Sequence, residues 1–337
     1  MKAFAVDSAQ NMLELDCPDP PPGPHDLLVR VEAVSVNPID CKIRASHRPD
    51  AAPRILGWDA SGVVEAVGEE VRLFKPGDAV MYAGSLDRPG SNAELQLVDE
   101  RLVGLKPRSL DFEQAAALPL TALTAWEALF EHLGIPPAPT TANRQRRLLV
   151  IGAAGGVGSM AIQLAKGLAG IPVLATASRP ESRDWCLKLG ADECLDHHGD
   201  LARQLADRGL DGVDYVLNCN STDAYLPLMA QLIRPFGRIC CLVSHEAPLD
   251  LNPLKSKSVA FAWEFMFTRP TFRTPDMATH HRILARLAEL VDQGRLRSTL
   301  TESLGPLTVE NLNAAHERLK SGRMIGKLAL SGVSSRT

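Results

Sequence analysis

A short apolar run in the middle of the chain leads into small residues at the spacing of a phosphate-binding turn. The run LLVIG (148–152) precedes a turn in which three small residues hold the positions of a G-x-G-x-x-G pattern, with Ala in the first place. Small residues there allow a tight turn, close approach of a pyrophosphate to the backbone, and close packing of a helix on a strand. The amides at the start of that helix also meet the phosphate charge. We therefore predict a dinucleotide site, against the alternative of a packing turn, at Ala153, Gly155, Gly156, Val157 and Gly158.

The residues that would choose between NAD and NADP follow this turn. An acid about 20 residues further on usually binds the ribose 2′-OH of NAD. That place is held by Ser178, and the first carboxylate after it is Glu181. Arg179 and Arg183 lie beside it, and guanidinium groups suit a 2′-phosphate. The pattern predicts NADP(H), with a solvated helix start as the alternative reading of the two arginines.

Composition limits the remaining classes of function. The chain has 337 residues, of which 45% are hydrophobic and 23% charged, with a net charge of −4. This length predicts two domains, and the charge gives no broad attraction for nucleic acid. No apolar run is long enough to span a bilayer, and the first residues lack the pattern of a signal peptide, so we expect a cytoplasmic protein. The seven cysteines show no CxxC spacing, and we interpret them as reduced thiols.

Secondary-structure signals divide the chain. Short strand-like runs with Pro and Gly between them fill residues 1–105, beginning with a strand and turn, and predict a barrel-like β domain. Asp111 and Gln114 predict a capped helix start, and Pro119 predicts its end or a kink. Residues 136–147 are polar and Pro-rich, which predicts a surface loop.

Beyond residue 147, strands and helices alternate about every dozen residues, as in a parallel sheet with helices on both faces. The last strand, GKLALS, must complete a sheet elsewhere, so we expect it to return to the first domain. The predicted fold class is α/β, with a β-barrel-type domain and a doubly wound parallel-sheet domain. The expected boundaries are 1–123, 124–270 and a C-terminal return over 271–337.

Several long strings resemble those of the medium-chain dehydrogenase/reductase superfamily, and more closely its quinone oxidoreductase branch, especially the group of zinc-type alcohol dehydrogenase-like proteins. The resemblance covers nearly the whole chain and implies a GroES-like catalytic domain joined to a Rossmann domain. It is carried by VNPIDCKIR (36–44), ILGWDASGVVEAVG (55–68), FKPGDAVMYAG (74–84), SLDRPGSNAE (85–94), AAALPLTALTAW (115–126), GAAGGVGSMAIQLAK (152–166), WEFMFTR (263–269) and GKLAL (326–330).

The resemblance also locates the places of a catalytic zinc site. The first Cys ligand falls on Asn37, the His ligand on Trp58 and the second Cys on Ala117, with the neighbouring acid at Asp59. Asn is a weak zinc ligand, and Trp and Ala offer no lone pair to a metal. The four-Cys lobe that holds a structural zinc is missing too. We therefore expect no metal. The alternative is a substitute site made of Cys41, His47 and Asp40, whose spacing matches no zinc pattern.

Without a metal, a conjugated carbonyl or quinone accepts a hydride more readily than a simple ketone does. The resemblance thus implies an NADPH-dependent reductase of quinones or α,β-unsaturated carbonyls. Two alternatives remain: a zinc-dependent alcohol dehydrogenase with an unrecognised metal site, and an NADPH-binding protein with little catalysis. The expected partners are the small-molecule acceptor and a second copy of the chain, which would pair through the edge of the Rossmann sheet, and neither nucleic acid nor membrane.

The same resemblance suggests individual roles, each with a structural alternative. Asn37 would donate to the substrate oxygen or to the nicotinamide edge, and its structural alternative is an Asn that fixes the turn before Pro38. Tyr82 would donate a proton, and its alternative is a core Tyr. Asp40 would orient Lys42 or a loop amide, and a helix cap is the favoured alternative for Asp40. Lys42 stands where quinone reductases often carry Tyr. The expected walls of the acceptor pocket are Trp58, Trp263 and Phe265, and the alternative for these side chains is core packing. Further cofactor contacts are expected from Thr121, Asn218, Leu242, Val243 and Lys327, the last against a solvated lysine.

Overall fold

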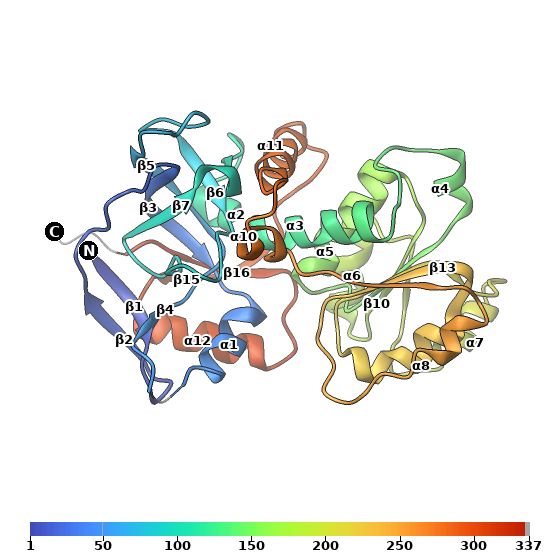
Figure 1. Ribbon diagram of the computed structural model, residues 1–337. Helices are drawn as coiled ribbons and strands as arrows, with labels where there is room; N and C mark the ends of the chain where they lie inside the picture. Colours follow the sequence, from blue (N-terminus) through green and yellow to red (C-terminus); the bar gives the residue numbers. More distant parts are fainter. Residues whose placement is uncertain (49, 334–337) are drawn as a thin grey trace. The chain divides into compact units, whose positions relative to one another are not determined.

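The structure, a computed structural model, describes residues 1–48 and 50–333 (Figure 1). The chain forms two compact units. The first unit is Met1–Leu123 together with the chain from Phe267 onward, and the second is Thr124–Met266. The chain re-enters the first unit just before residue 271, where the sequence places that boundary.

The largest sheet of the first unit combines strands from both ends of the chain. Its order is β15-β16-β3-β5-β6-β8, and β7 pairs with β3 beside this path. β16 runs antiparallel to β3, with Ala329 opposite Ser35, so the C-terminal strand completes a sheet begun near the N-terminus. The strands are β3 (Asp26–Ser35), β5 (Ala60–Val67), β6 (Ala79–Tyr82), β7 (Leu95–Asp99), β8 (Val103–Leu105), β15 (Leu300–Pro306) and β16 (Lys327–Ser331).

A smaller sheet and several helices complete this unit. The predicted N-terminal strand and turn form a hairpin of β1 (Lys2–Val6) and β2 (Met12–Asp16), which β4 (Arg54–Ile55) extends. The predicted cap is confirmed, because Asp111 and Gln114 form a capping box at the start of α2. The helical segments are α1 (Pro38–Ala45), η1 (Glu100–Leu102), α2 (Phe112–Ala116), α3 (Pro119–Trp126), α10 (Thr268–Phe272), α11 (Thr279–Asp292) and α12 (Val309–Lys320). α3 runs on into the second unit.

The second unit is built on a parallel sheet with the order β11-β10-β9-β12-β13-β14. Numbered from its first strand, this order is 3-2-1-4-5-6, which is the order of the doubly wound dinucleotide fold. Its strands are β9 (Leu148–Ile151), β10 (Val173–Thr176), β11 (Glu193–Leu195), β12 (Val213–Asn218), β13 (Ile233–Cys241) and β14 (Ala260–Trp263). The α/β prediction is confirmed, with a GroES-like unit and a Rossmann-like sheet.

Helices cover both faces of this sheet. Figure 1 shows α7 and α8 together on one face and α5 on the other. Leu201 of α7 and Met229 of α8 belong to a core cluster with the sheet residues Val216 and Ile239. The helical segments are η2 (Glu127–His132), α4 (Thr141–Gln145), α5 (Gly156–Leu164), η3 (Ala165–Ala169), α6 (Pro180–Leu189), α7 (Leu201–Ala206), α8 (Thr222–Leu232) and α9 (Asn252–Lys255).

The segment 136–147, predicted as a loop, contains the short helix α4. The buried amide of Asn143 holds it in place by donating hydrogen bonds to the main-chain oxygens of Pro136, Ala138 and Ala169. Hydrogen bonds from a buried amide to main-chain oxygens leave no apolar pattern for sequence reasoning to detect. None of the helices in residues 1–48 and 50–333 is long and apolar enough to cross a membrane.

Candidate active site

The glycine-rich turn of the second unit has the geometry that a dinucleotide requires. Gly152 follows β9 with φ of 74° and donates its N–H to Thr176 Oγ1 at 3.0 Å. A Cβ on Gly158 would lie 2.6 Å from the Cα atom and main-chain oxygen of Ala153. Only glycine therefore lets α5 begin this close to the turn. Gly152 was missed by the pattern match, although its left-handed backbone takes the part expected of the first glycine.

The start of α5 offers free backbone donors. Gly155 is its N-cap residue and supplies no side chain to the first turn. The N–H groups of Val157 and Gly158 donate to no other residue that the structure describes. A helix start with unused amides and no covering side chain binds anions well, since the helix dipole adds to the hydrogen bonds. The turn thus fits the pyrophosphate of a dinucleotide.

The residues predicted to choose the cofactor lie between β10 and α6. Ser178 and Arg179 are half-buried and directly precede α6, and Arg183 lies one turn inside it. Glu181 pairs with Arg179 at 3.2 Å, and both side chains are partly exposed. Position 178 is a serine rather than an acid, and the guanidinium groups of Arg179 and Arg183 are the positive charges next to it.

Asn218 ends β12, beside the turn that follows β9. Its Oδ1 atom accepts from the Asn220 N–H at 3.1 Å, and its main-chain oxygen accepts from the Leu242 N–H at 3.1 Å. Leu242 and Val243, which follow β13, are half-buried. The carboxyl ends of β9 and β12 border the point where the strand order reverses, which is where such sheets bind ligands. The three predicted contacts thus lie at the expected edge, and their contact with a cofactor stays a prediction.

A buried lysine organises the candidate site of the first unit. Lys327, 4% exposed, donates to Asn37 Oδ1 at 2.6 Å, to the Val36 main-chain oxygen at 2.9 Å, and to Asp59 Oδ2 at 3.1 Å. An ammonium group has three N–H donors, and all three are used. The prediction that Lys327 reaches the cofactor phosphates is therefore wrong, and so is the alternative of a solvated lysine.

Asn37 is held on both sides of its amide. Its Nδ2 atom donates to Asp59 Oδ2 at 3.0 Å and to the Ser35 main-chain oxygen at 3.3 Å. Its main-chain N–H donates to Asp40 Oδ2 at 2.8 Å, so that Asp40 caps α1. Asn37, Asp40, Asp59 and Lys327 form one buried group of side chains, which we call the Lys327 network.

Burial sets the protonation of this network. It raises the pKa of Asp40 to about 7, against the Asn37 amide and the Lys327 charge, which lower it. It also raises the pKa of Asp59 and lowers that of Lys327, and the attraction between these two groups opposes both shifts. The Oδ1 atom of Asp40 has no hydrogen-bond partner within the described chain. The network holds two carboxyl groups, Asp40 and Asp59, but only one ammonium, that of Lys327. A proton on Asp40 would therefore balance its charge.

The other predicted catalytic residues have different surroundings. Lys42 is exposed on α1, whereas the carboxyl group of Asp40 is buried and accepts from Asn37, so the predicted pairing of Asp40 with Lys42 is wrong. Tyr82 ends β6 in the interior, and its hydroxyl finds no partner among the residues described. Burial raises the pKa of Tyr82, which keeps it protonated. The hydroxyl of Thr121 on α3 donates to the main-chain oxygen of Leu118, just before that helix, at 3.1 Å.

The predicted pocket aromatics fall into two groups. Trp58 has no exposed surface, and its indole N–H donates to the Ser85 main-chain oxygen at 3.0 Å, as in the core-packing alternative. In the second unit, Trp263 and Phe265 are 42% and 46% exposed at the end of β14. Trp263 stacks on His245 with ring centroids 6.0 Å apart. These two side chains leave apolar surface open to a ligand or a protein partner.

Comparison with known proteins identifies the family. Residues 23–107 match the alcohol dehydrogenase GroES-like domain, and residues 189–330 match the zinc-binding dehydrogenase family. A zinc-type alcohol dehydrogenase-like protein of Staphylococcus epidermidis is 44% identical over 98% of this chain and 97% of its own. A quinone oxidoreductase of Pseudomonas syringae pv. Tomato is 27% identical, with a TM-score of 0.83 over 98% of this chain and 99% of its own. The chain belongs to the medium-chain dehydrogenase/reductase superfamily, in its quinone oxidoreductase branch.

Other members of the superfamily with solved structures are similar over the full length. A Rhizobium etli CFN 42 protein, assigned to the zinc-dependent alcohol dehydrogenases, is 46% identical with a TM-score of 0.94, over 99% of this chain and 98% of its own. Mycobacterial Rv1454c, solved in complex with NADPH, is 27% identical with a TM-score of 0.81, over 98% of this chain and 99% of its own. This medium-chain dehydrogenase/reductase is therefore an oxidoreductase.

The zinc implied by these family names does not fit the residues present. Both polar atoms of the Asn37 side chain are used inside the Lys327 network, and Trp58 and Ala117 offer no ligand. The substitute site of Cys41, His47 and Asp40 does not fit a metal either, because Cys41 donates to the His316 main-chain oxygen and Asp40 caps α1. Within residues 1–48 and 50–333, no three His, Cys, Asp or Glu side chains converge as a metal site would require.

Proposed function

We propose that this oxidoreductase reduces quinones or α,β-unsaturated carbonyls with NADPH and without catalytic zinc. The observation that carries the proposal is the Lys327 network, in which Asn37 is bound to an ammonium and a carboxylate rather than being free to hold a metal. A simple ketone needs a strong electrophile beside its oxygen, whereas a conjugated carbonyl spreads the developing charge and needs only modest hydrogen-bond donors.

The second unit supplies the cofactor site in this proposal. NADPH, when bound, supplies the hydride. The amides of Val157 and Gly158 would hold its pyrophosphate, and Arg179 and Arg183 its 2′-phosphate. The NADPH complex of mycobacterial Rv1454c supports this assignment, as do the arginines that stand in place of an acid.

In the first unit, we assign the proton donor to Tyr82. Its hydroxyl forms no hydrogen bond with a described residue, and burial keeps it protonated. By contrast, the side chains of Asn37 and Asp40 are used inside the network, where they fix the start of α1 and act as positioning residues. A phenol that is not paired in the resting protein can donate to the oxygen or carbon that gains negative charge.

The test is NADPH consumption by chelator-treated protein with a quinone, an enone and a simple ketone. We expect turnover of the first two without metal and little of the third. Loss of all activity on chelation, restored by zinc, would overturn the proposal in favour of a zinc-dependent alcohol dehydrogenase. Tight NADPH binding without turnover of any acceptor would instead favour a cofactor-binding protein.

We further propose that the protein is a homodimer formed through the edge of the second unit's sheet. β14 is the end strand of that sheet, and Trp263 on it and Phe236 on β13 are 42% and 83% exposed. Pairing of two β14 edges would satisfy their backbone groups and cover these rings. Light scattering during gel filtration should give a dimer mass, and Trp263→Asp should lower it. Phe272, which is 75% exposed and lies in the first unit, serves as the control as Phe272→Asp, and a monomeric wild type would refute the proposal.

A further inference from the structure

Two thiols of the second unit lie against each other next to the residues predicted to choose the cofactor. Cys186 belongs to α6 and Cys194 to β11. Cys186 has no exposed surface, and Cys194 is 4% exposed. The Cys194 thiol donates to the main-chain oxygen of Arg183 at 3.6 Å, and Arg183 lies one turn before Cys186 on the same face of α6. The Cys194 sulfur is therefore held against the part of α6 that carries Cys186.

The two sulfur atoms also interact directly. The Cys186 thiol donates a hydrogen bond to the sulfur of Cys194. This hydrogen bond and the positive charge of Arg183 lower the pKa of Cys194, whereas burial and Asp184 oppose the shift. The same hydrogen bond, together with burial, raises the pKa of Cys186. Cys194 is therefore the more readily ionised sulfur of the pair, and it lies beside a cation, as reactive cysteines do.

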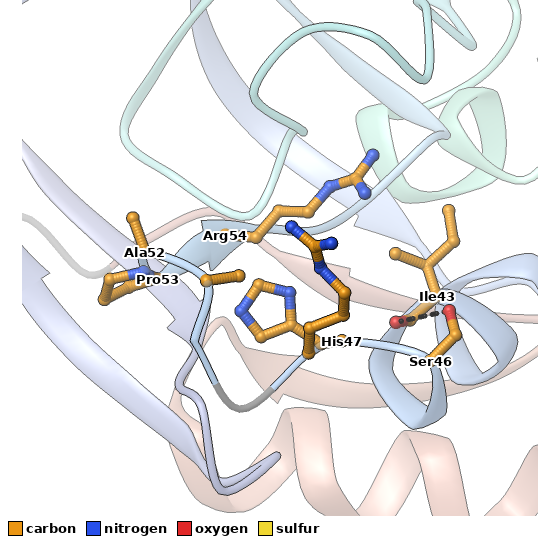
Figure 2. Close-up of a pocket in the computed structure, with 8 residues that line it drawn as sticks. Ile43, Ser46, His47, Ala52, Pro53 and Arg54 are labelled. Carbon is orange, nitrogen blue, oxygen red and sulfur yellow. Dashed lines mark hydrogen bonds between the residues drawn. The ribbon is translucent and has the colours of Figure 1, made fainter.

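Cys41 of the first unit is the matched single thiol. It is partly exposed on α1 and donates to the His316 main-chain oxygen. The last turn of α1 borders a pocket (Figure 2), and none of the described residues that line this pocket is a cysteine. Because Cys41 is more exposed than Cys194, a small oxidant reaches it more readily, but no second thiol on that side can close a disulfide with it.

We propose that hydrogen peroxide oxidises Cys186 and Cys194 to a disulfide, and that this bond lowers the affinity of the protein for NADPH. In the first step, the Cys194 thiolate attacks a peroxide oxygen and the O–O bond breaks. A sulfenic acid forms, and the departing hydroxide takes up the proton that the thiol had released. In the second step, the Cys186 sulfur attacks the Cys194 sulfur, the S–O bond breaks and a second water leaves. The thiols lose two electrons, and the peroxide gains them.

The disulfide would act on the cofactor site through α6. It holds its sulfur atoms about 2.05 Å apart, closer than a hydrogen bond does, and it removes the proton that Cys194 donates to the Arg183 oxygen. α6 would therefore shift against β11, and Arg179 at its N-cap and Arg183 would move with it. A guanidinium holds a phosphate through hydrogen bonds of fixed geometry, so a displaced α6 binds the 2′-phosphate less well. This effect rests on the proposed NADPH function, whereas formation of the disulfide does not.

The test compares the full chain after hydrogen peroxide with the same protein after dithiothreitol. Peptide mapping by mass spectrometry should find Cys186 joined to Cys194 in the first sample and both thiols free in the second. Calorimetry should show that the oxidised protein binds NADPH about tenfold or more weakly, as for loss of one charge-assisted hydrogen bond, while NADH binding changes little. Dithiothreitol should restore the affinity for NADPH.

Serine variants separate this disulfide from oxidation elsewhere. Cys194→Ser removes the sulfur that reacts first, so its affinity for NADPH should no longer respond to peroxide. Cys186→Ser should form no disulfide with Cys194. Cys41→Ser is the control and should respond to peroxide as the wild type does. Should a buried serine prevent folding, the peptide map and the calorimetry of wild type still decide.

The outcomes separate this inference from the function on which its effect rests. Peroxide-treated wild type with Cys186 and Cys194 unjoined, or joined to other cysteines, would overturn the proposal. A disulfide between them that leaves NADPH affinity unchanged would overturn the control of cofactor binding. If the reduced protein binds no NADPH, the proposed function fails and the control of cofactor binding fails with it. The peptide map then still shows whether the two thiols form a disulfide.

Discussion

Lys327 donates a hydrogen bond of 2.6 Å to Asn37, across 290 residues of sequence. The bond joins the last strand, β16, to the turn before α1, and Asp59 on the other side of the ammonium completes a buried ion pair. Burial of this pair is expensive unless every donor and acceptor is satisfied. The first unit thus depends on its C-terminal return for charge balance as well as for sheet pairing.

Lys327→Met should destabilise the protein by about 3–5 kcal/mol, because it leaves the Asp59 carboxylate buried without its cation. Urea unfolding measures the loss. Asp59→Asn combined with Lys327→Met removes both charges and should recover much of the stability, since neither charge is then left uncompensated. Lys75→Met, at an exposed position, serves as the control. A double variant as unstable as the sum of the two single variants would contradict the ion-pair account.

In the first unit, the sequence predicted the family and the lost zinc ligands but not the contacts of Lys327. The strings around Asn37, Trp58 and Lys327 predicted the family and the loss of zinc ligands, because those are local patterns. They did not predict that Lys327 would be buried, since its partners lie far away in the sequence and meet it only through the pairing of β16 with β3. Long-range pairing of polar groups leaves no periodic signal, so Lys327 was interpreted as a cofactor contact.

Gly158→Ala should weaken NADPH binding at least tenfold and lower the melting temperature. Its new Cβ would lie 2.6 Å from the backbone of Ala153 and push α5 away from the turn. At Gly155, a Cβ would lie 3.5 Å from the Gly152 oxygen, an ordinary contact. Gly155→Ala should therefore keep the melting temperature. Fluorescence titration with NADPH and a thermal melt measure both effects, and an unchanged Gly158→Ala variant would contradict the packing argument.

The cofactor turn of the second unit was easier to predict from the sequence than the Lys327 network of the first. The turn is built from adjacent residues whose small size is itself the signal, so Gly155 and Gly158 were found without a structure. Gly152 was missed because the pattern reserves its first glycine for the place held by Ala153, whereas the positive φ falls one residue earlier. A search for the residue that must be left-handed after a buried strand would have found it.

Arg179→Gln together with Arg183→Gln should lower affinity for NADPH and leave affinity for NADH nearly unchanged. Each guanidinium can form a charge-assisted hydrogen bond to the 2′-phosphate, and such a bond contributes about 1.5–3 kcal/mol. The combined variant should thus lose at least tenfold in NADPH affinity, measured by calorimetry. Arg203→Gln, at an exposed position on α7, is the control. Equal losses for both cofactors would show that the arginines stabilise α6 and do not choose the phosphate.

Stability should fall in weak acid because of His316. This residue of α12 is fully buried with both ring nitrogens unpartnered among the described residues. Burial, with Arg44 and Lys320 nearby, lowers the pKa of His316 from 6.5 to about 4, and Glu317 opposes the shift. As pH falls below 6.5, the unfolded chain takes the proton first, so this contribution is present above pH 6.5 and lost by about pH 4.

The expected loss from His316 is about 3 kcal/mol over that range, from the linkage between pKa and stability. The measurement is urea unfolding of wild type and His316→Leu between pH 7 and pH 4. The variant should show a shallower fall, because a leucine has no proton to gain. His198→Gln, an exposed histidine, should follow the wild type. If the unfolding free energies of wild type and His316→Leu fall in parallel with pH, the folded protein protonates His316 as readily as the unfolded chain does, and the prediction is wrong.

Tyr82→Phe should separate a catalytic hydroxyl from a structural one. Its hydroxyl is buried without a described partner, so its removal should leave stability unchanged or raise it slightly. As the assigned proton donor, its loss should lower kcat for an enone by about 100-fold or more, the usual contribution of a positioned acid. Stopped-flow measurement of NADPH oxidation checks this, with Tyr225→Phe on the half-buried α8 position as the control. If Tyr82→Phe turns over at the wild-type rate, the hydroxyl belongs to the core, and the proton reaches the product from solvent instead.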